Sequence, residues 1–185
     1  MNDDNAIERF KRGDPSLFAD LVLKYQDRIY NLCRYMLENS HDAEDAAQDT
    51  FLKAYQGLGS YSPAASFYTW LYRIAVNTCL DHKRKFSFRS LFFSDERTNR
   101  IDSFPSRAPS PESACATTQS MHALQAALTL LSKKLRVVIV LHELEGLSYE
   151  EIAEILDISV GTVKSRISRA REELKKILHQ PMEQK

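Results

Sequence analysis

The chain is short and carries no net charge. It has 185 residues with 43% apolar side chains, which suits one ordinary domain or two small helical ones and excludes a large catalytic domain. Lysine plus arginine and aspartate plus glutamate each number 25, so the global charge predicts no attraction to nucleic acid. The distribution is uneven, because residues 1–60 hold seven basic and eleven acidic side chains, whereas residues 61–100 hold seven and three. An acidic segment is therefore followed by a basic one.

Cysteine usage and hydropathy indicate a protein of the reducing cytoplasm. Cys33, Cys79 and Cys115 stand far apart, without the spacing of a zinc site or a disulfide framework, so we expect buried thiols and neither a metal nor a cofactor. The first residues lack a basic segment followed by an apolar one, and the longest strongly apolar run is Val137 to Leu141. We therefore expect a cytoplasmic protein without membrane insertion.

Three helices are predicted in the first half of the chain. Asp14 followed by Pro15 is typical of a helix start, and apolar residues recur after it at helical spacing. A second helix is predicted from near Ser40 to about Leu58, with acidic residues in its first turn. A third begins near Ser66 and runs to the basic residues 83–85. These helices predict a compact helical domain over residues 6–86.

A linker separates this domain from a second one. Residues 103–120 contain five serines and three prolines with almost no large apolar side chain, so they cannot bury enough surface to fold. The preceding residues 86–93 are too apolar for a simple tether, and packing on a neighbouring domain or on a partner both remain open. No β-alternation of useful length occurs, so we expect an all-α protein with a flexible linker over 87–120 and a second helical domain over 121–178.

The second domain contains a helix-turn-helix pattern. Ser148 and Glu151 have the spacing of a capping box, which predicts a helix from 148 to 156. Asp157 begins a tight turn, and Ser159 can cap another helix starting at Val160. That helix has an apolar face, and its other residues are small, polar or basic, which suits base edges and phosphates in the major groove. The residues expected to face DNA are Gly161, Thr162, Lys164, Ser165, Arg166, Ser168, Arg169 and Arg171.

One side of the predicted helix over 40–58 is acidic. Asp42, Asp45 and Asp49 share it with Gln48 alongside, while alanines lie on the other side. Carboxylates spread over two turns without histidine make a poor metal site. Two readings remain open from the residues alone, a docking face for a basic protein surface and a merely solvated face.

The segment 66–78 mixes aromatic residues with Arg73 and precedes the basic residues 83–85. This combination suits unstacked bases and backbone phosphates, so it is a candidate for binding nucleic acid. Much of the segment must still form core. For Trp70, packing in that core and stacking on a base are both open.

Three segments together resemble regions 2 and 4 of the extracytoplasmic-function sigma factors: DAEDAAQDTFLKAY (42–55), SFYTWLYRIAVNT (66–78) and LSYEEIAEILDISVGTVKSRISRAREEL (147–174). The resemblance extends from about Ala6 to Leu178 and implies a subunit of RNA polymerase that selects promoters. It implies that Asp45, Gln48 and Asp49 bind the clamp helices of the largest subunit of core polymerase, and that the C-terminal helix reads the minus-35 element.

The resemblance also assigns the basic and aromatic segment to the minus-10 element, which this family opens by capturing a flipped base beside the loop from Tyr61 to Ala65. The minus-10 residues it implies are Tyr61, Trp70, Arg73, Asn77, Lys83, Arg84 and Lys85. The implied partners are core RNA polymerase, promoter DNA and a cognate anti-sigma factor, with the linker threading the polymerase between the two DNA sites.

Two other classes of protein compete with this reading. A stand-alone helix-turn-helix regulator accounts for residues 160–174, but it explains nothing in the first half of the chain. An enzyme such as a recombinase would require a nucleophile and an arginine or metal cluster. No nucleophile-elbow, zinc-protease, P-loop or carboxylate-metal motif occurs in the sequence, so we expect a protein that is not an enzyme.

Overall fold

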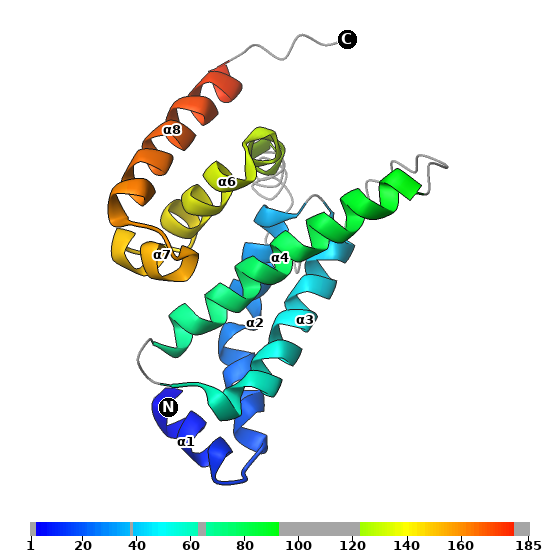
Figure 1. Cartoon of the computed structure of the whole chain (residues 1–185), viewed down its shortest axis with the longest axis vertical. Coiled ribbons are helices and arrows are strands. Elements are labelled where there is room, and N and C mark those ends of the chain that lie inside the picture. The colour runs from blue at the N-terminus through cyan, green and yellow to red at the C-terminus, as the bar shows by residue number, and fades with distance from the viewer. Residues whose placement is uncertain (1–2, 38, 63–65, 93–122, 180–185) are drawn as a thin grey trace, which may run out of the picture.

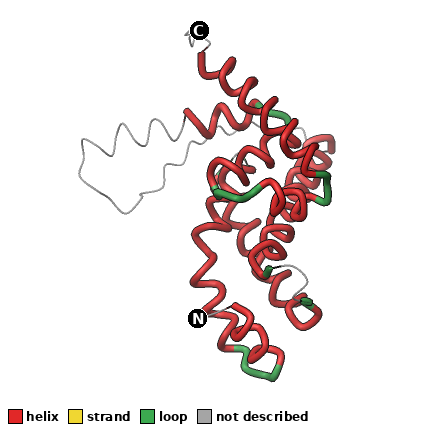
Figure 2. The backbone as a smooth tube through the Cα atoms, turned by 90° about the vertical axis from the view of Figure 1, so that its left-hand side faces the viewer, coloured by secondary structure: helices red, strands yellow, loops and turns green. Residues whose placement is uncertain are grey.

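The computed structural model of the chain describes residues 3–37, 39–62, 66–92 and 123–179, and for residues 83–92 it describes the backbone alone. Within these ranges every regular element is a helix (Figure 2). The helices form two groups that lie against each other, one built from the blue to green part of the chain and one from the yellow to red part (Figure 1). The prediction of an all-α protein with two helical domains is confirmed.

The N-terminal domain is built on three long helices that follow a short one. Its elements are α1 (Asp3–Lys11), α2 (Ser16–Met36), α3 (Ser40–Gly57), the 3-10 turn η1 (Leu58–Ser60) and α4 (Phe67–Phe92). Side chains fix two of the starts. Asn39 accepts a hydrogen bond from the backbone N–H of Asp42 at 2.7 Å, and Ser66 accepts one from that of Thr69 at 3.1 Å. Such caps satisfy donors that have no partner inside the helix.

The core of this domain lies between α2, α3 and α4. The apolar stripe predicted for the first long helix is buried, with no member more than 7% exposed: Leu17, Leu21, Tyr25, Ile29 and Leu32. Small residues of α3, Ala43 and Ala46, are fully buried and let the helices approach closely. Leu71 and Ala75 of α4 complete the same cluster.

Two of the three cysteines meet in this core. Cys33 and Cys79 are free and buried, with their Sγ atoms 3.5 Å apart, as expected for buried thiols. The hydrogen bond from Cys79 and burial both raise the pKa of the Cys33 thiol, so it stays protonated. Cys115 lies outside the described residues.

The structure differs from the sequence-based expectation at two helix ends and adds one helix. The helix α1 was not predicted. Its residues Ala6 and Ile7 are buried against the domain, and its Asp3 accepts a hydrogen bond from Tyr25 at 2.5 Å. The cap residue of α2 is Pro15, and no side chain caps its N-terminus. The helix α4 continues to Phe92, beyond the basic residues where the sequence predicted its end. The remaining residues of the predicted linker lie outside the described ranges.

The C-terminal domain consists of shorter helices. Residues 123–130 are helical, and α6 (Lys133–Ile139) continues into a π-helical turn, η2 (Val140–Leu144). The pair α7 (Tyr149–Leu156) and α8 (Val160–His179) follows. The core of the domain is formed by apolar residues that are at most 3% exposed, among them Leu128, Leu131, Val138, Leu141, Ile152, Val163 and Ile167.

The two domains also pack on each other. The helix α7 lies against α4, while α6 and η2 lie against α2. Arg136 of α6 is 3% exposed at this boundary, although it carries a full charge. The sequence did not predict this contact between the domains.

Candidate nucleic-acid and polymerase interfaces

The acidic face of the N-terminal domain lies on α3. The side chains of Asp45 and Asp49 are 50% and 47% exposed, and Gln48 between them is exposed as well. Histidines stand beside both carboxylates. His41 lies 3.9 Å from Asp45, and His82 of α4 lies 3.0 Å from Asp49. The structure thus brings together the three predicted polymerase-binding residues on one solvent-facing surface.

The predicted minus-10 residues on α4 divide by exposure. Arg73 and Asn77 are exposed, and Trp70 is half-buried. Tyr61 is only 5% exposed, and its ring lies 5.2 Å from that of Trp70 and 6.0 Å from that of Phe67. Burial raises the pKa of the Tyr61 hydroxyl. The rings of Tyr61 and Trp70 therefore form part of one aromatic cluster behind the exposed polar residues.

Two features extend this surface of α4. The guanidinium of Arg73 donates a hydrogen bond to the backbone carbonyl of Glu154 in α7, so it is held by the other domain. The backbone of Lys83, Arg84 and Lys85 continues the same helix, which places the three residues along α4, while their side chains lie outside the described part.

Local hydrogen bonds build the helix-turn-helix. The Ser148 side chain accepts from the backbone N–H of Glu151 at 3.2 Å, and the Glu151 carboxylate accepts from that of Ser148 at 2.8 Å, which confirms the predicted capping box. Asp157 ends α7 in the left-handed conformation, with φ of 53°. Ser159 then accepts from the backbone N–H of Thr162 at 3.2 Å and caps α8.

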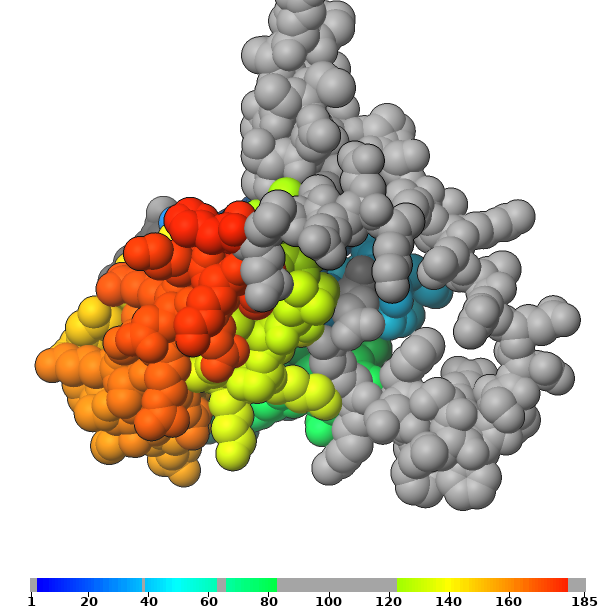
Figure 3. Space-filling model, turned by 90° about the horizontal axis from the view of Figure 1, so that it is seen from above, coloured from blue at the N-terminus to red at the C-terminus, as the bar shows by residue number. Residues whose placement is uncertain are grey.

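The helix α8 has the two faces that the sequence predicted. Val163, Ile167 and Ala170 are at most 1% exposed and face α6 and α7. On the other side Gly161, Lys164, Ser165, Ser168 and Arg169 are exposed, and Thr162 and Arg166 are half-buried. Seen from above, α8 forms one outer edge of the molecule (Figure 3). An exposed helix of this composition can enter a DNA groove without rearrangement of its own domain.

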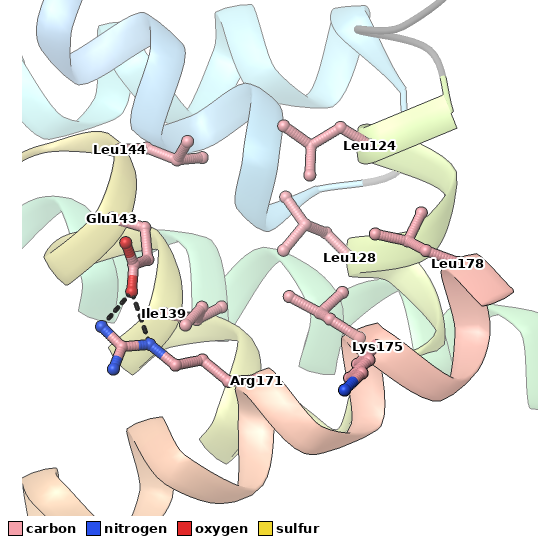
Figure 4. Close-up of a pocket in the computed structure, with 9 residues that line it drawn as sticks. Leu124, Leu128, Ile139, Glu143, Leu144, Arg171, Lys175 and Leu178 are labelled. Carbon is pink, nitrogen blue, oxygen red and sulfur yellow. Dashed lines mark hydrogen bonds and ion pairs between the residues drawn. The ribbon is translucent and has the colours of Figure 1, made fainter.

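Two cations of α8 already have partners within the domain. Lys164 Nζ lies 5.7 Å from the centroid of the Tyr149 ring. Arg171 donates two hydrogen bonds to one oxygen of Glu143, at 2.8 and 2.5 Å, beside an apolar groove of about 410 Å³ (Figure 4). A contact of Arg171 with DNA stays a prediction, since its Nε and one terminal nitrogen are already bonded to Glu143.

No metal centre or membrane span was found in the part of the chain that the structure describes. Those residues contain no group of three or more potential metal-ligating side chains, and no described helix is both long and apolar enough to cross a membrane. The exposed helix of a helix-turn-helix, joined to a domain with a separate acidic face, is the architecture of a two-domain DNA-binding protein.

The sequence reasoning missed the residues that join the domains. Tyr72 and Glu145 are hydrogen-bonded across the boundary at 2.5 Å, and Arg136 reaches the carbonyl of Met36 at 3.1 Å. The sequence could have indicated a buried role for Arg136, because it is a charged residue inside the apolar run from Leu135 to Leu141. No pattern in the sequence indicates the pair of Tyr72 and Glu145, since 73 positions separate them in the chain.

Comparison with known proteins agrees with this geometry. The chain matches the family model of Sigma-70 region 2 over residues 21–88 and that of Sigma-70 region 4 over residues 121–174. It is 41% identical over 176 residues to the ECF RNA polymerase sigma factor SigW of Bacillus subtilis (strain 168), with 93% of this chain and 94% of that protein covered. It is 39% identical over 184 residues to the RNA polymerase sigma-H factor of Pseudomonas aeruginosa, with 97% and 95% covered.

Two solved structures have a similar fold. The structure of CnrH in complex with the cytosolic domain of CnrY matches with a TM-score of 0.70 at 26% identity, covering 94% of each chain. The sigma factor RpoE in complex with the anti-sigma factor NepR from Bartonella quintana matches with a TM-score of 0.72 at 26% identity, covering 88% of this chain and 97% of that one.

The chain belongs to the extracytoplasmic-function family of RNA polymerase sigma factors. It is therefore a transcription initiation factor, and the family resemblance of its three sequence segments is confirmed. The N-terminal domain is sigma region 2, and the C-terminal domain is sigma region 4.

Proposed function

We propose that the chain binds core RNA polymerase through α3 and places two DNA-binding helices, α4 and α8, on the minus-10 and minus-35 elements of a promoter. The observation that carries this proposal is the separation of surfaces. An acidic, exposed face lies in one domain, and a polar and basic recognition helix lies at an outer edge of the other. The acidic face has the charge that a basic surface of polymerase would attract, and the outer face of α8 has the composition that DNA would attract.

The polymerase contact is assigned to Asp45, Gln48 and Asp49. Both carboxylates are about half exposed, so they can meet a basic surface without unfolding the domain. Opposite charges across an interface speed association and fix its register, whereas like charges oppose it by several kcal/mol. The clamp helices of the largest polymerase subunit are the partner that this family implies.

Reversing the acidic charges tests this contact. Asp45→Lys with Asp49→Lys is expected to weaken holoenzyme formation by on the order of 100-fold or more. Stability should change by no more than about 1 kcal/mol, since Asp45 is half exposed and Asp49 loses a partly exposed contact with His82. The matched control is Asp20→Lys with Asp27→Lys, which reverses two exposed carboxylates of α2. Equal polymerase affinity of both double variants in a titration would contradict the assignment of the polymerase contact to Asp45 and Asp49.

The minus-10 contact is assigned to the exposed residues of α4. Arg73 and Asn77 contact the DNA strand, and the basic residues 83–85 extend the contact to phosphates. Trp70 is half-buried, and its exposed part is assigned to the same contact. A direct contact of Tyr61 with a base stays a prediction, since its buried ring has to leave Phe67 and Trp70 to make it. Alanine variants of Arg73 and Asn77 should open promoters poorly, as measured by permanganate footprints of the holoenzyme.

The minus-35 contact is assigned to the outer face of α8. Arg169 and Ser165 lie near its centre and Lys164 and Arg166 at its margins, so central residues should read bases and marginal ones should hold phosphates. Gly161, Thr162 and Ser168 leave room for close approach of the helix to the groove.

The remaining functional assignments follow from family membership. We infer a cytoplasmic protein that is not an enzyme and that is controlled by an anti-sigma factor. The alternative, a stand-alone helix-turn-helix regulator, makes a different prediction. Such a regulator retains a promoter duplex unaided, whereas the chain proposed here does so only after core polymerase is added. A gel-shift titration with and without core polymerase distinguishes the two.

A further inference from the structure

The short helix α1 contacts both the backbone and the side chain of Tyr61. Lys11, the last residue of α1, donates a hydrogen bond from Nζ to the backbone carbonyl of Tyr61 at 2.5 Å. The same Nζ lies 5.8 Å from the centroid of the Tyr61 ring, within the range of a cation–π contact. Burial raises the pKa of the Tyr61 hydroxyl, and the carboxylates of Asp4 and Asp3 raise it further. Tyr61 is therefore near charged groups from both ends of α1.

The position of α1 is itself fixed by contacts with two other helices. Asp3, at its start, accepts a hydrogen bond from the hydroxyl of Tyr25 in α2 at 2.5 Å. Near its end, the ring of Phe10 lies 6.1 Å from that of Phe18 in α2 and 5.4 Å from that of Tyr55 in α3. A helix of nine residues is marginal in water by itself, so these tertiary contacts keep it formed and keep Lys11 in place.

Tyr61 in turn packs on Trp70. The ring of Trp70 lies 5.2 Å from that of Tyr61 and 5.7 Å from that of Phe67. Gly57 of α3 leaves room for the indole, because a Cβ at that position would lie 3.2 Å from it. Trp70 is half-buried in this cluster, and its exposed part belongs to the surface assigned above to the minus-10 element. A series of contacts thus leads from Lys11 through Tyr61 to a residue assigned to DNA.

We propose that Lys11 is a positioning residue for the minus-10 contact. By fixing the backbone and the ring of Tyr61, it keeps Trp70 in the orientation in which its exposed part meets the DNA strand. A side chain that is already ordered before binding loses less conformational entropy when it binds, so such support favours promoter opening. This inference depends on the proposed function of α4.

Three variants of the full chain test the role of Lys11. Lys11→Met keeps most of the length of the side chain and removes both the donor and the charge, whereas Lys11→Arg keeps both. The matched control is Arg12→Met, which removes a cation from the neighbouring position, where the guanidinium lies 3.5 Å from Glu8. Lys11 and Arg12 are exposed, so none of these changes should unfold the domain, as checked by circular dichroism.

The fluorescence of Trp70 measures its support directly. Trp70 is the single tryptophan of the chain, so the emission and its quenching by acrylamide report on this side chain alone. Lys11→Met should shift the emission to longer wavelength and increase the quenching, because the indole becomes more accessible to water. Lys11→Arg and Arg12→Met should keep the values of the parent chain. Unchanged emission and quenching in Lys11→Met would overturn the support of Trp70 by Lys11.

Promoter opening by reconstituted holoenzyme measures the functional consequence. Lys11→Met should lower opening by about fivefold in permanganate footprints, the factor that one ordinary hydrogen bond contributes. Lys11→Arg should restore it, and Arg12→Met should open promoters as the parent does. The salt dependence of DNA binding should not change in Lys11→Met, because no phosphate contact is lost. A salt slope reduced by about one unit would make Lys11 a phosphate contact and overturn the positioning role.

The variant Trp70→Ala separates this inference from the function on which it depends. Normal promoter opening by holoenzyme carrying Trp70→Ala would overturn the assignment of Trp70 to the minus-10 element, whatever the fluorescence of Lys11→Met. If Trp70→Ala impairs opening, adding Lys11→Met should cause no further loss, because Lys11 acts through Trp70. Additive losses, or normal opening in Lys11→Met despite altered fluorescence, would overturn the proposed role of Lys11.

Discussion

Regions 2 and 4 acquire their binding surfaces in different ways. In region 4, hydrogen bonds between residues three positions apart, at Ser148 and Ser159, set where α7 and α8 begin. In region 2, caps at Asn39 and Ser66 also fix two helix starts, but burial of large side chains between three long helices sets the helix positions, and the binding faces are the sides that remain exposed. The comparison teaches that the surface proposed to read DNA in region 4 depends on local signals, whereas the surface proposed to bind polymerase in region 2 depends on a core assembled from distant segments.

The largest expected effects come from cavities in the two cores. Ile152→Ala in α7 and Leu71→Ala in α4 remove fully buried side chains and should each lower the free energy of unfolding by about 2–5 kcal/mol. Ile152→Ala should impair minus-35 binding and spare polymerase binding, and Leu71→Ala should impair polymerase binding. Denaturant unfolding and polymerase titrations measure both. If each variant loses both minus-35 binding and polymerase binding, the domains fold as one unit, which contradicts separate origins for the two surfaces.

The next effect distinguishes the residues of α8 that contact bases from those that contact phosphates. Arg169→Ala should cost about 1–3 kcal/mol at one minus-35 base pair and relax preference there. Lys164→Ala should lower affinity for all sequences and reduce the salt slope by about one unit. Holoenzyme binding to a randomised minus-35 library at two salt concentrations measures both. Altered base preference in Lys164→Ala, with none in Arg169→Ala, would mean that α8 is rotated relative to our assignment.

A smaller effect is expected from the cap of α7. Ser148→Ala removes one side of the capping box and should destabilise region 4 by about 1 kcal/mol. The matched change in region 2 is Ser66→Ala at the start of α4. Only the first should weaken minus-35 binding, because α4 is held mainly by its buried residues. Equal loss of minus-35 binding in both variants would contradict a local origin for the region 4 surface.

The smallest effect is a pH dependence of the domain packing. Burial is the main cause that raises the pKa of Glu145, while the hydrogen bond from Tyr72 and the charge of Arg28 lower it. Because the packed state binds this proton more tightly than a solvated carboxylate does, packing gains stability below the ordinary pKa of a carboxyl group. That gain is lost as the pH rises through the raised pKa of Glu145.

Small-angle scattering of the full chain across the titration range of carboxyl groups measures this dependence. Tyr68, Lys24 and Glu151 line the same cleft between the domains as Glu145, so Glu145→Gln is the necessary control. The parent chain should expand more than the Glu145→Gln variant as the pH rises. Identical profiles would assign the dependence to other groups.

Much of the molecule followed from local pattern. The sequence predicted the capping box, the turn at Asp157, the buried face of α8 and the apolar stripe of α2, and the structure has all of them. It also predicted that Asp45 and Asp49 face solvent. These features depend on residues within one or two helical turns of each other, so the spacing in the sequence contains the necessary information.

Other features were decided by tertiary structure alone. Met36 and Arg136 meet across 100 positions, Arg73 is held by a backbone carbonyl of α7, and Tyr61 has its ring in a cluster with Phe67 and Trp70. An aromatic or basic residue has the same local propensity whether it faces DNA, a core or another domain. The surroundings of such a residue depend on how helices from distant parts of the chain pack. Hydrophobic burial is not directional, so it does not specify which apolar residues meet, and the close packing of the whole fold decides this.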